Sequence, residues 1–353
     1  MSDAHRWRSF RALPYAHGGP PVQGRLRASA EDFAVDEELG FAADGDGEHR
    51  LVRVRKVGAN TDWVARRLAV LAGVSPSAVG YAGLKDRHAV VTQWLSVPVA
   101  NRPEPDWAST GSEGFEVLEV HRHRRKLRRG VLAGNRFRLL IRDIRGDRGR
   151  LDGRLRTLVE RGVPNYFGEQ RFGHDDGNLT RATALFEGRA GRVDRRRRGL
   201  WLSAARSQLF NEVLAERVAR GDWGAPLAGD RMQLAGSHSH FAAETVDAAL
   251  RQRVSAGDLS PTGPLWGRGG PSTTGDPARL EEEVGAAFPI WVAGLEAAGL
   301  KQERRALRLL PKDLSWDWPA DDVLELSFRL PAGSYATALL RELVDWHGGG
   351  SLS

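Results

Sequence analysis

The hydrophobic pattern changes twice along this chain, and these changes limit its fold more than any single motif. Up to residue 164, alternating and β-branched segments predict strands at 24–41, 89–99 and 134–144, with helices at 59–74 and 151–164. From 165 to about 310 the pattern is mainly helical. It predicts helices at 203–220, capped by Ser203, and at 280–299, with a Gly/Pro-rich loop at 260–278 between them. After 310 a strand, a tight turn and a helix follow within 321–346.

Length and cysteine content narrow the class of protein. A chain of 353 residues is expected to form one large or two moderate domains. No segment approaches the roughly 18 consecutive apolar residues of a membrane span, and the N-terminal residues do not resemble a signal peptide. The chain has no cysteine, which excludes disulfides, thiol catalysis and cysteine-bound zinc. We expect a soluble cytoplasmic protein that does not bind membranes.

Positive charge is concentrated in the middle of the chain. Residues 121–200 hold 23 Lys and Arg against 9 Asp and Glu, although the net charge of the whole chain is only +7. Nearly all these cations are arginine, which suits bidentate contacts with phosphate and stacking on bases. A solvated face with an arginine-rich composition is the alternative. The clustering at 121–130 and 194–199 favours a nucleic acid as partner.

Motifs for cofactors and metals are missing from the sequence. It has no phosphate-binding P-loop, no glycine-rich dinucleotide fingerprint, no HExxH and no CxxC pair. The histidine pairs His121/His123 and His238/His240 lack a third ligand and are expected to be surface residues. The acidic stretch at 174–178 is expected to be a turn. We therefore expect no cofactor and no metal, and chemistry carried by ordinary side chains.

The segment GLKDR (83–87) places Asp86 between Lys85 and Arg87, just before a predicted buried strand. Positive neighbours favour the ionised form of a carboxylate, which can then act as a nucleophile or as an electrostatic stabiliser. The alternative is a turn aspartate in an exposed salt bridge, which contributes about 0–1 kcal/mol.

Seven segments, in order along the chain, resemble the TruD family of tRNA pseudouridine synthases. Four are GLKDR with the following QWLSV, NYFGEQRFG (165–173), RSQLFNEVLAER (206–217) and LPAGSYATALLRELV (330–344). The others are DFAVDEELGF (32–41), KLRRGVLAGNRFRL (126–139) and ALRLLPKDLSWDW (306–318). The resemblance implies isomerisation of uridine to pseudouridine in tRNA, typically uridine 13 of the D-arm, with no cofactor.

The resemblance also implies site residues. The essential aspartate of the family maps to Asp86, with attack on the uracil ring or on the anomeric carbon both left open. Phe33 maps to the uridine pocket, Asn135 to a hydrogen bond with the nucleotide, and Tyr335 to stacking on the target base. Some members have phenylalanine at the Tyr335 position, so a role for its hydroxyl is not implied. Arg27 maps to a basic position that pairs with the carboxylate, where lysine also occurs. For Phe33 the alternative is a core aromatic, and for Asn135 a strand-edge or turn residue.

The fold that the resemblance implies is α+β. A catalytic core with a central mixed, mostly antiparallel sheet would comprise 1–161 and 311–353, and a family-specific α/β domain would be inserted at 162–310. The implied partner is tRNA, without membrane or metal, and a monomer is expected. A non-catalytic RNA-binding protein or RNA chaperone on the same fold is the alternative function.

Overall fold

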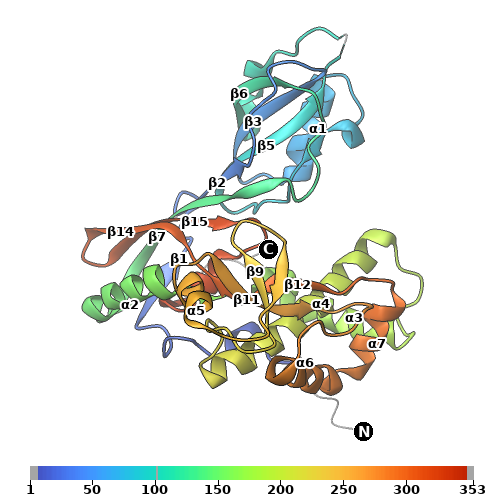
Figure 1. Cartoon of the computed structure of the whole chain (residues 1–353). Coiled ribbons are helices and arrows are strands. Elements are labelled where there is room, and N and C mark those ends of the chain that lie inside the picture. The colour runs from blue at the N-terminus through green and yellow to red at the C-terminus, as the bar shows by residue number, and fades with distance from the viewer. Residues whose placement is uncertain (1–6, 101, 348–353) are drawn as a thin grey trace. The chain divides into compact units, whose positions relative to one another are not determined.

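The computed structural model describes residues 7–100 and 102–347, which form two compact units (Figure 1). Unit 1 contains the described residues up to Pro21, Asp147–Leu310 and Ser334–Val344. Unit 2 contains Val22–Gly146, Pro311–Gly333 and the described residues from Asp345. The predicted functional domains divide the chain at other points, and they stay a prediction.

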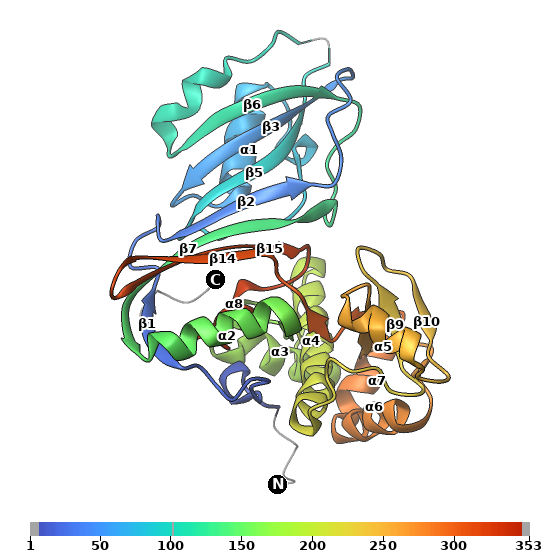
Figure 2. The same cartoon turned by 60° about the vertical axis from the view of Figure 1, so that its left-hand side comes forward.

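Unit 2 is built on a sheet of ten strands, in which β14, β15, β7, β2, β5, β3 and β6 are successive neighbours (Figure 2). β2 and β5 are parallel, and the other neighbours in this order are antiparallel. The predicted mixed, mostly antiparallel central sheet is therefore confirmed. The strands are β1 (Val22–Leu26), β2 (Phe33–Leu39), β3 (His49–Val57), β4 (Gly80–Tyr81), β5 (Val90–Pro98), β6 (Phe115–His123), β7 (Leu132–Gly146), β14 (Lys312–Ala320), β15 (Val323–Pro331) and β16 (Val344–His347).

Within unit 2, an α-helix covers part of this sheet. Helix α1 (Thr61–Leu71) packs Val64 and Leu68, both fully buried, against apolar residues of β3, β5 and β6 (Figure 1). Burying such a side chain contributes about 1.5–3 kcal/mol, so this face fixes the helix on the sheet. The helix thereby holds the start of its own first turn beside the segment that precedes β5. Unit 2 also contains two 3-10 helices, at Pro76–Ala78 and Trp107–Glu113. A third 3-10 helix, at Phe10–Ala12, belongs to unit 1.

Unit 1 combines helices with two small sheets. A sheet of four strands has the order β10, β9, β11, β12, and β8 pairs with β13. The helices are α2 (Arg148–Arg161), α3 (Gly177–Phe186), α4 (Arg195–Arg220), α5 (Ala248–Ser255), α6 (Gly275–Ala287), α7 (Pro289–Ala297) and α8 (Ala336–Leu340), with 3-10 turns at Glu169–Arg171 and His174–Asp176. The strands are β8 (Val163–Pro164), β9 (Arg231–Leu234), β10 (His240–Ala242), β11 (Leu259–Leu265), β12 (Glu303–Ala306) and β13 (Arg308–Leu309).

Three sequence-based expectations for unit 1 were wrong. Helix α4 begins at Arg195 with Asp194 as its cap, so Ser203 lies inside the helix. The expected loop at 260–278 contains most of β11, because its small and proline residues still pair with β9 and β12. The expected helix at 280–299 is two helices, since Phe288 leaves the helical conformation and Pro289 starts the second.

Candidate functional site

Asp86 lies in the irregular segment between β4 and β5, and its side chain is 22% exposed. Its Oδ2 forms an ion pair with Nη2 of Arg27 at 2.6 Å, and the Arg27 side chain is 4% exposed. The flanking cations, which the sequence suggested as partners, bind elsewhere: Arg87 donates from Nε to the carbonyl oxygen of Gly58 at 2.9 Å, and Lys85 turns to Glu37. The expected contact of Arg27 with the carboxylate is thus present. Asp86 is paired with a buried arginine, and not in the exposed turn salt bridge of the alternative interpretation.

The position of Arg27 depends on its own backbone and on Phe33. Arg27 follows β1 with φ of 55°, in the left-handed region that residues with a side chain seldom adopt. Its guanidinium lies 3.9 Å from the centre of the Phe33 ring, which in turn meets Phe137 edge to face. Phe33 is 4% exposed, so in this structure it is a core aromatic that supports Arg27.

Lys56 in β3 is fully buried and contacts the Asp86 backbone. Its ammonium donates to the carbonyl oxygens of Asp86 at 2.7 Å and of Ala59 at 2.8 Å. Burial lowers the pKa of Lys56 to about 8, an effect that the charge of Asp86 opposes and that of Lys85 adds to. Two neutral carbonyls and a nearby carboxylate therefore stabilise a buried cation that is hydrogen-bonded to the backbone of the candidate nucleophile.

The residue before Asp86 connects two further strands. The ammonium of Lys85 pairs with Glu37 of β2 at 3.2 Å and donates to Oδ1 of Asn135 in β7. Glu37 is fully buried as a side chain, and this burial raises the pKa of its carboxyl above the ordinary value despite Lys85 and the Trp94 N–H. Since Lys85 occupies the oxygen of Asn135, the amide NH₂ is left to donate. Asn135 is half-buried on the β7 face that it shares with Phe137.

Hydrogen bonds from α1 and β5 hold the backbone on the other side. The Lys85 N–H donates to Oγ1 of Thr61 at 3.1 Å, and that hydroxyl donates to Oε1 of Gln93 at 2.9 Å. The Gln93 amide then donates to the carbonyl oxygen of Gly83 at 2.8 Å. The segment 83–87 is irregular in shape, but its backbone is anchored at Gly83, Lys85 and Asp86.

Tyr335 belongs to unit 1 and is half-buried, directly before α8. Its hydroxyl accepts a hydrogen bond from Nε of Arg171 at 3.0 Å, and its ring meets Phe167 at 5.8 Å between centroids. Arg171 also donates to Oγ of Ser203 in α4 at 3.0 Å. The hydroxyl of Tyr335 therefore has a structural partner that the resemblance did not suggest.

Three of the family-like segments contact one another in the same region. The amide of Asn211 in α4 accepts from the Phe167 N–H at 2.9 Å and donates to the Phe167 carbonyl at 3.0 Å. A Cβ on Gly168 would lie 2.4 Å from Oγ1 of Thr337 and 3.3 Å from the Tyr335 ring, so only glycine fits. The segments 165–173, 206–217 and 330–344 thus meet around Tyr335.

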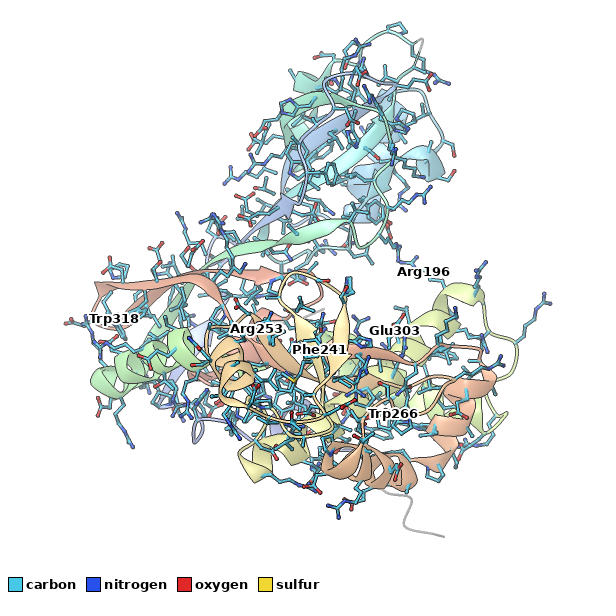
Figure 3. The ribbon with its side chains drawn as sticks, viewed as in Figure 1. Arg196, Phe241, Arg253, Trp266, Glu303 and Trp318 are labelled. Atoms are coloured by element: carbon cyan, nitrogen blue, oxygen red, sulfur yellow. The ribbon has the colours of Figure 1, made fainter. Side chains whose placement is uncertain are left out.

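Other parts of the described chain offer no comparable site. Within residues 7–100 and 102–347, no three His, Cys, Asp or Glu side chains are grouped so as to hold a metal ion. A hollow of about 380 Å³ opens between β10 and α5, where Phe241 and Arg253 are labelled in Figure 3. Its lining also includes Glu244 and Asp247, and Asp247 is engaged in capping α5. Among the described helices, each is too short or too polar to cross a membrane.

Comparisons with known proteins agree on one family. The family model described as "tRNA pseudouridine synthase D (TruD)" matches residues 10–186 and 177–343. A protein of that name from Methylococcus capsulatus is 50% identical over 337 residues, which cover 96% of this chain and 95% of the relative. Another, from Nitrosococcus oceani, is 51% identical and covers 93% of each chain. The fold matches a crystal structure titled as the putative tRNA pseudouridine synthase D of Methanosarcina mazei, with a TM-score of 0.72, 21% identity and coverage of 94% and 95%. The chain belongs to the TruD family of tRNA pseudouridine synthases.

Sequence reasoning missed several residues of this site. It overlooked β3 and with it Lys56, and it gave no role at the site to Glu37, Gln93 or Thr61. The alternation of β3 contained a signal, because Lys56 is in phase with Val52 and Val54, which are both fully buried. A lysine at a core position of a strand indicates either an error in the predicted register or a buried cation that is paired with other groups.

Proposed function

We propose that this chain converts uridine 13 in the D-arm of tRNA to pseudouridine, with Asp86 as the nucleophile. Members of the TruD family isomerise uridine to pseudouridine in tRNA, and membership assigns that reaction to this chain. The position within tRNA and the roles of individual residues are what we add. The observation that carries the assignment of Asp86 is its partly exposed carboxylate, paired with Arg27 on a backbone held by Lys56.

The reaction needs a nucleophile in a fixed place. Because it is an isomerisation, it needs no oxidant or reductant. The bond between C1′ and N1 of the uridine breaks, and a bond between C1′ and C5 forms. C5 loses its hydrogen as a proton, and N1 gains one, so atoms and electrons balance. Attack by the Asp86 carboxylate on the uracil ring or on C1′ divides this exchange into easier steps. An anchored backbone serves either route, because small displacements of a reacting group cost large factors in rate.

The other site residues have roles that follow from their contacts. Arg27 orients the carboxylate, and Phe33, which is only 4% exposed, supports the uridine pocket through its contact with the Arg27 guanidinium. Asn135, with its oxygen taken by Lys85, donates to the nucleotide through its NH₂ group. Tyr335 stacks on the target base, a contact of about 1–3 kcal/mol, in an orientation that Arg171 fixes through the hydroxyl.

Two arginine-rich segments, 121–130 and 194–199, are proposed to contact the phosphates of tRNA. Arg195–Arg198 are exposed at the start of α4, and Figure 3 labels Arg196 there. Cations at this end of a helix oppose its dipole, and Asp194 is the acidic residue that caps it. An anionic partner would offset this unfavourable placement, and RNA binding should weaken steeply with salt. A cytoplasmic monomer remains our proposal for the working form.

The experiment compares wild type with Asp86→Asn on tRNA transcripts that carry uridine or cytidine at position 13. We expect wild type to form pseudouridine at position 13 and to lose product with the cytidine transcript. Asp86→Asn should lose turnover while its affinity for the transcript stays within a few-fold. A product at another position would refute the choice of uridine 13. Full turnover by Asp86→Asn would refute the nucleophile, and binding without turnover by wild type would favour the RNA-binding alternative.

A further inference from the structure

Leu84 stands out among the apolar side chains of unit 2, because it is 53% exposed within the segment that carries Asp86. A single exposed leucine needs no explanation by itself. Leu118 in β6, for example, is 45% exposed on the same unit. Leu84 differs because of what surrounds it along the chain.

The backbone on both sides of Leu84 is fixed. The carbonyl of Gly83 accepts from Gln93 at 2.8 Å, and the N–H of Lys85 donates to Thr61 at 3.1 Å. The side chain of Lys85 is 10% exposed and is paired with Glu37. Between these anchors, Leu84 offers an apolar side chain to solvent from a backbone that cannot easily retract it.

A cationic turn is fastened to the chain just before Leu84. This turn, residues 124–131 between β6 and β7, donates from the Gly130 N–H to the Ala82 carbonyl at 2.9 Å. Gly80 has no room for a Cβ, which would lie 2.4 Å from the Leu127 carbonyl oxygen. The turn therefore packs directly on residues 80–82, and its Arg125 and Arg128 are exposed. A polyanion that these arginines contact is brought next to Leu84.

A reactive uridine must leave the base stack before a side chain can reach its ring or its C1′. Unstacking costs a few kcal/mol for a stacked base and least for a base that is already single-stranded. Proteins commonly offset this cost by inserting an apolar side chain, often leucine, between the bases. A wedge has to be apolar, exposed and rigidly mounted beside the site that receives the base, and cations must hold the adjacent backbone.

We propose that Leu84 enters the base stack of the tRNA in the place that the target uridine vacates. Leu84 is thus a positioning residue, which acts on the neighbouring bases while Asp86 acts on the uridine. Arg125 and Arg128 hold the backbone phosphates beside it. This inference rests on the proposed function, since it takes Asp86 as the residue that the flipped uridine meets.

The test compares Leu84→Ala with the matched control Leu118→Ala on two substrates: a folded tRNA transcript and a short unstructured RNA with the same target uridine. We expect Leu84→Ala to lower kcat/KM on the tRNA by about tenfold or more, a loss the size of one stacking contact. On the unstructured RNA the loss should be under about threefold, because little unstacking is needed there. Leu118→Ala should match the wild-type kcat/KM on both substrates. Leu84→Met, which keeps a long apolar side chain, should retain most of the wild-type rate on tRNA.

Equal losses on both substrates would mean that Leu84 supports the loop and would overturn the proposal, as would wild-type rates for Leu84→Ala on tRNA. A second measurement needs no turnover. In the Asp86→Asn background, 2-aminopurine next to the target should brighten on binding when Leu84 is present and brighten less with Leu84→Ala. Failure of the proposed nucleophile appears separately, as turnover by Asp86→Asn itself.

Discussion

Replacing Lys56 by methionine should remove a pH dependence from the stability of the protein and slow its turnover. Methionine keeps the length and apolar character of the stem but has no proton to donate. The ammonium lies fully buried under the Asp86 backbone, where two carbonyl oxygens accept its hydrogen bonds. The charges of Asp86 and Lys85 act on its pKa in opposite directions.

The magnitude follows from the pKa of Lys56. Burial lowers this pKa from 10.5 to about 8, so the folded protein disfavours the ammonium by about 3 kcal/mol relative to water. Between pH 8 and 10.5 the unfolded chain therefore binds more protons than the folded one, and the free energy of unfolding rises with pH. Below pH 8 both states are protonated, and the contribution is constant. Lys56→Met cannot titrate and lacks this rise.

The assay is urea unfolding of wild type and Lys56→Met at several pH values from 7 to 10.5. The difference between the two proteins cancels the titration of the groups that they share. We expect wild type to gain up to about 3 kcal/mol on the variant across the window. Turnover by Lys56→Met should fall by about tenfold or more, because the Asp86 carbonyl loses a charge-assisted hydrogen bond. A difference that stays flat with pH, or a variant with wild-type turnover, would refute the reasoning.

Three further predictions concern the surroundings of the site. Arg27→Lys should keep the charge but lose the contact with the Phe33 ring and part of the ion-pair geometry, so kcat should fall by about tenfold while tRNA affinity measured by filter binding is unchanged. Tyr335→Phe should retain stacking and lose only a few-fold in kcat/KM, whereas Tyr335→Ala should lose about tenfold or more; equal losses would argue against stacking. Gly168→Ala should lower the melting temperature, since its Cβ would collide with Thr337, and a variant as stable as wild type would contradict this packing.

Hydrophobic periodicity in the sequence predicted several helices and strands of the fold. Helix α1, β5 and β7 were found from their periodicity, because one face of each is buried against a single neighbouring layer. The start of α4 was misplaced since its first two turns are exposed and arginine-rich, and Ser203 looked like a cap. In the structure that hydroxyl instead accepts from Arg171, a partner that lies far away in sequence.

For the candidate site, the resemblance supplied residues that stay a prediction, and the structure supplied most of their contacts. The resemblance identified Asp86 and Arg27, and the structure shows them paired. The sequence suggested that Lys85 and Arg87 would accompany the carboxylate, yet both bind other groups. The side chains of this irregular segment take separate partners, and those of Asp86 are Arg27, which follows β1, and Lys56 of β3, which bonds its carbonyl. Such partners are set by the register of the sheet, which no local pattern reveals.

The most direct test of the account is the release of tritium from tRNA labelled at uracil C5, because C5 must lose its hydrogen when it bonds to C1′. The measurement compares wild type with Asp86→Asn on transcripts to which both bind. We predict release by wild type and none above background by Asp86→Asn. Release by both proteins would contradict the assignment of Asp86 as the nucleophile, and release by neither would contradict the isomerisation itself.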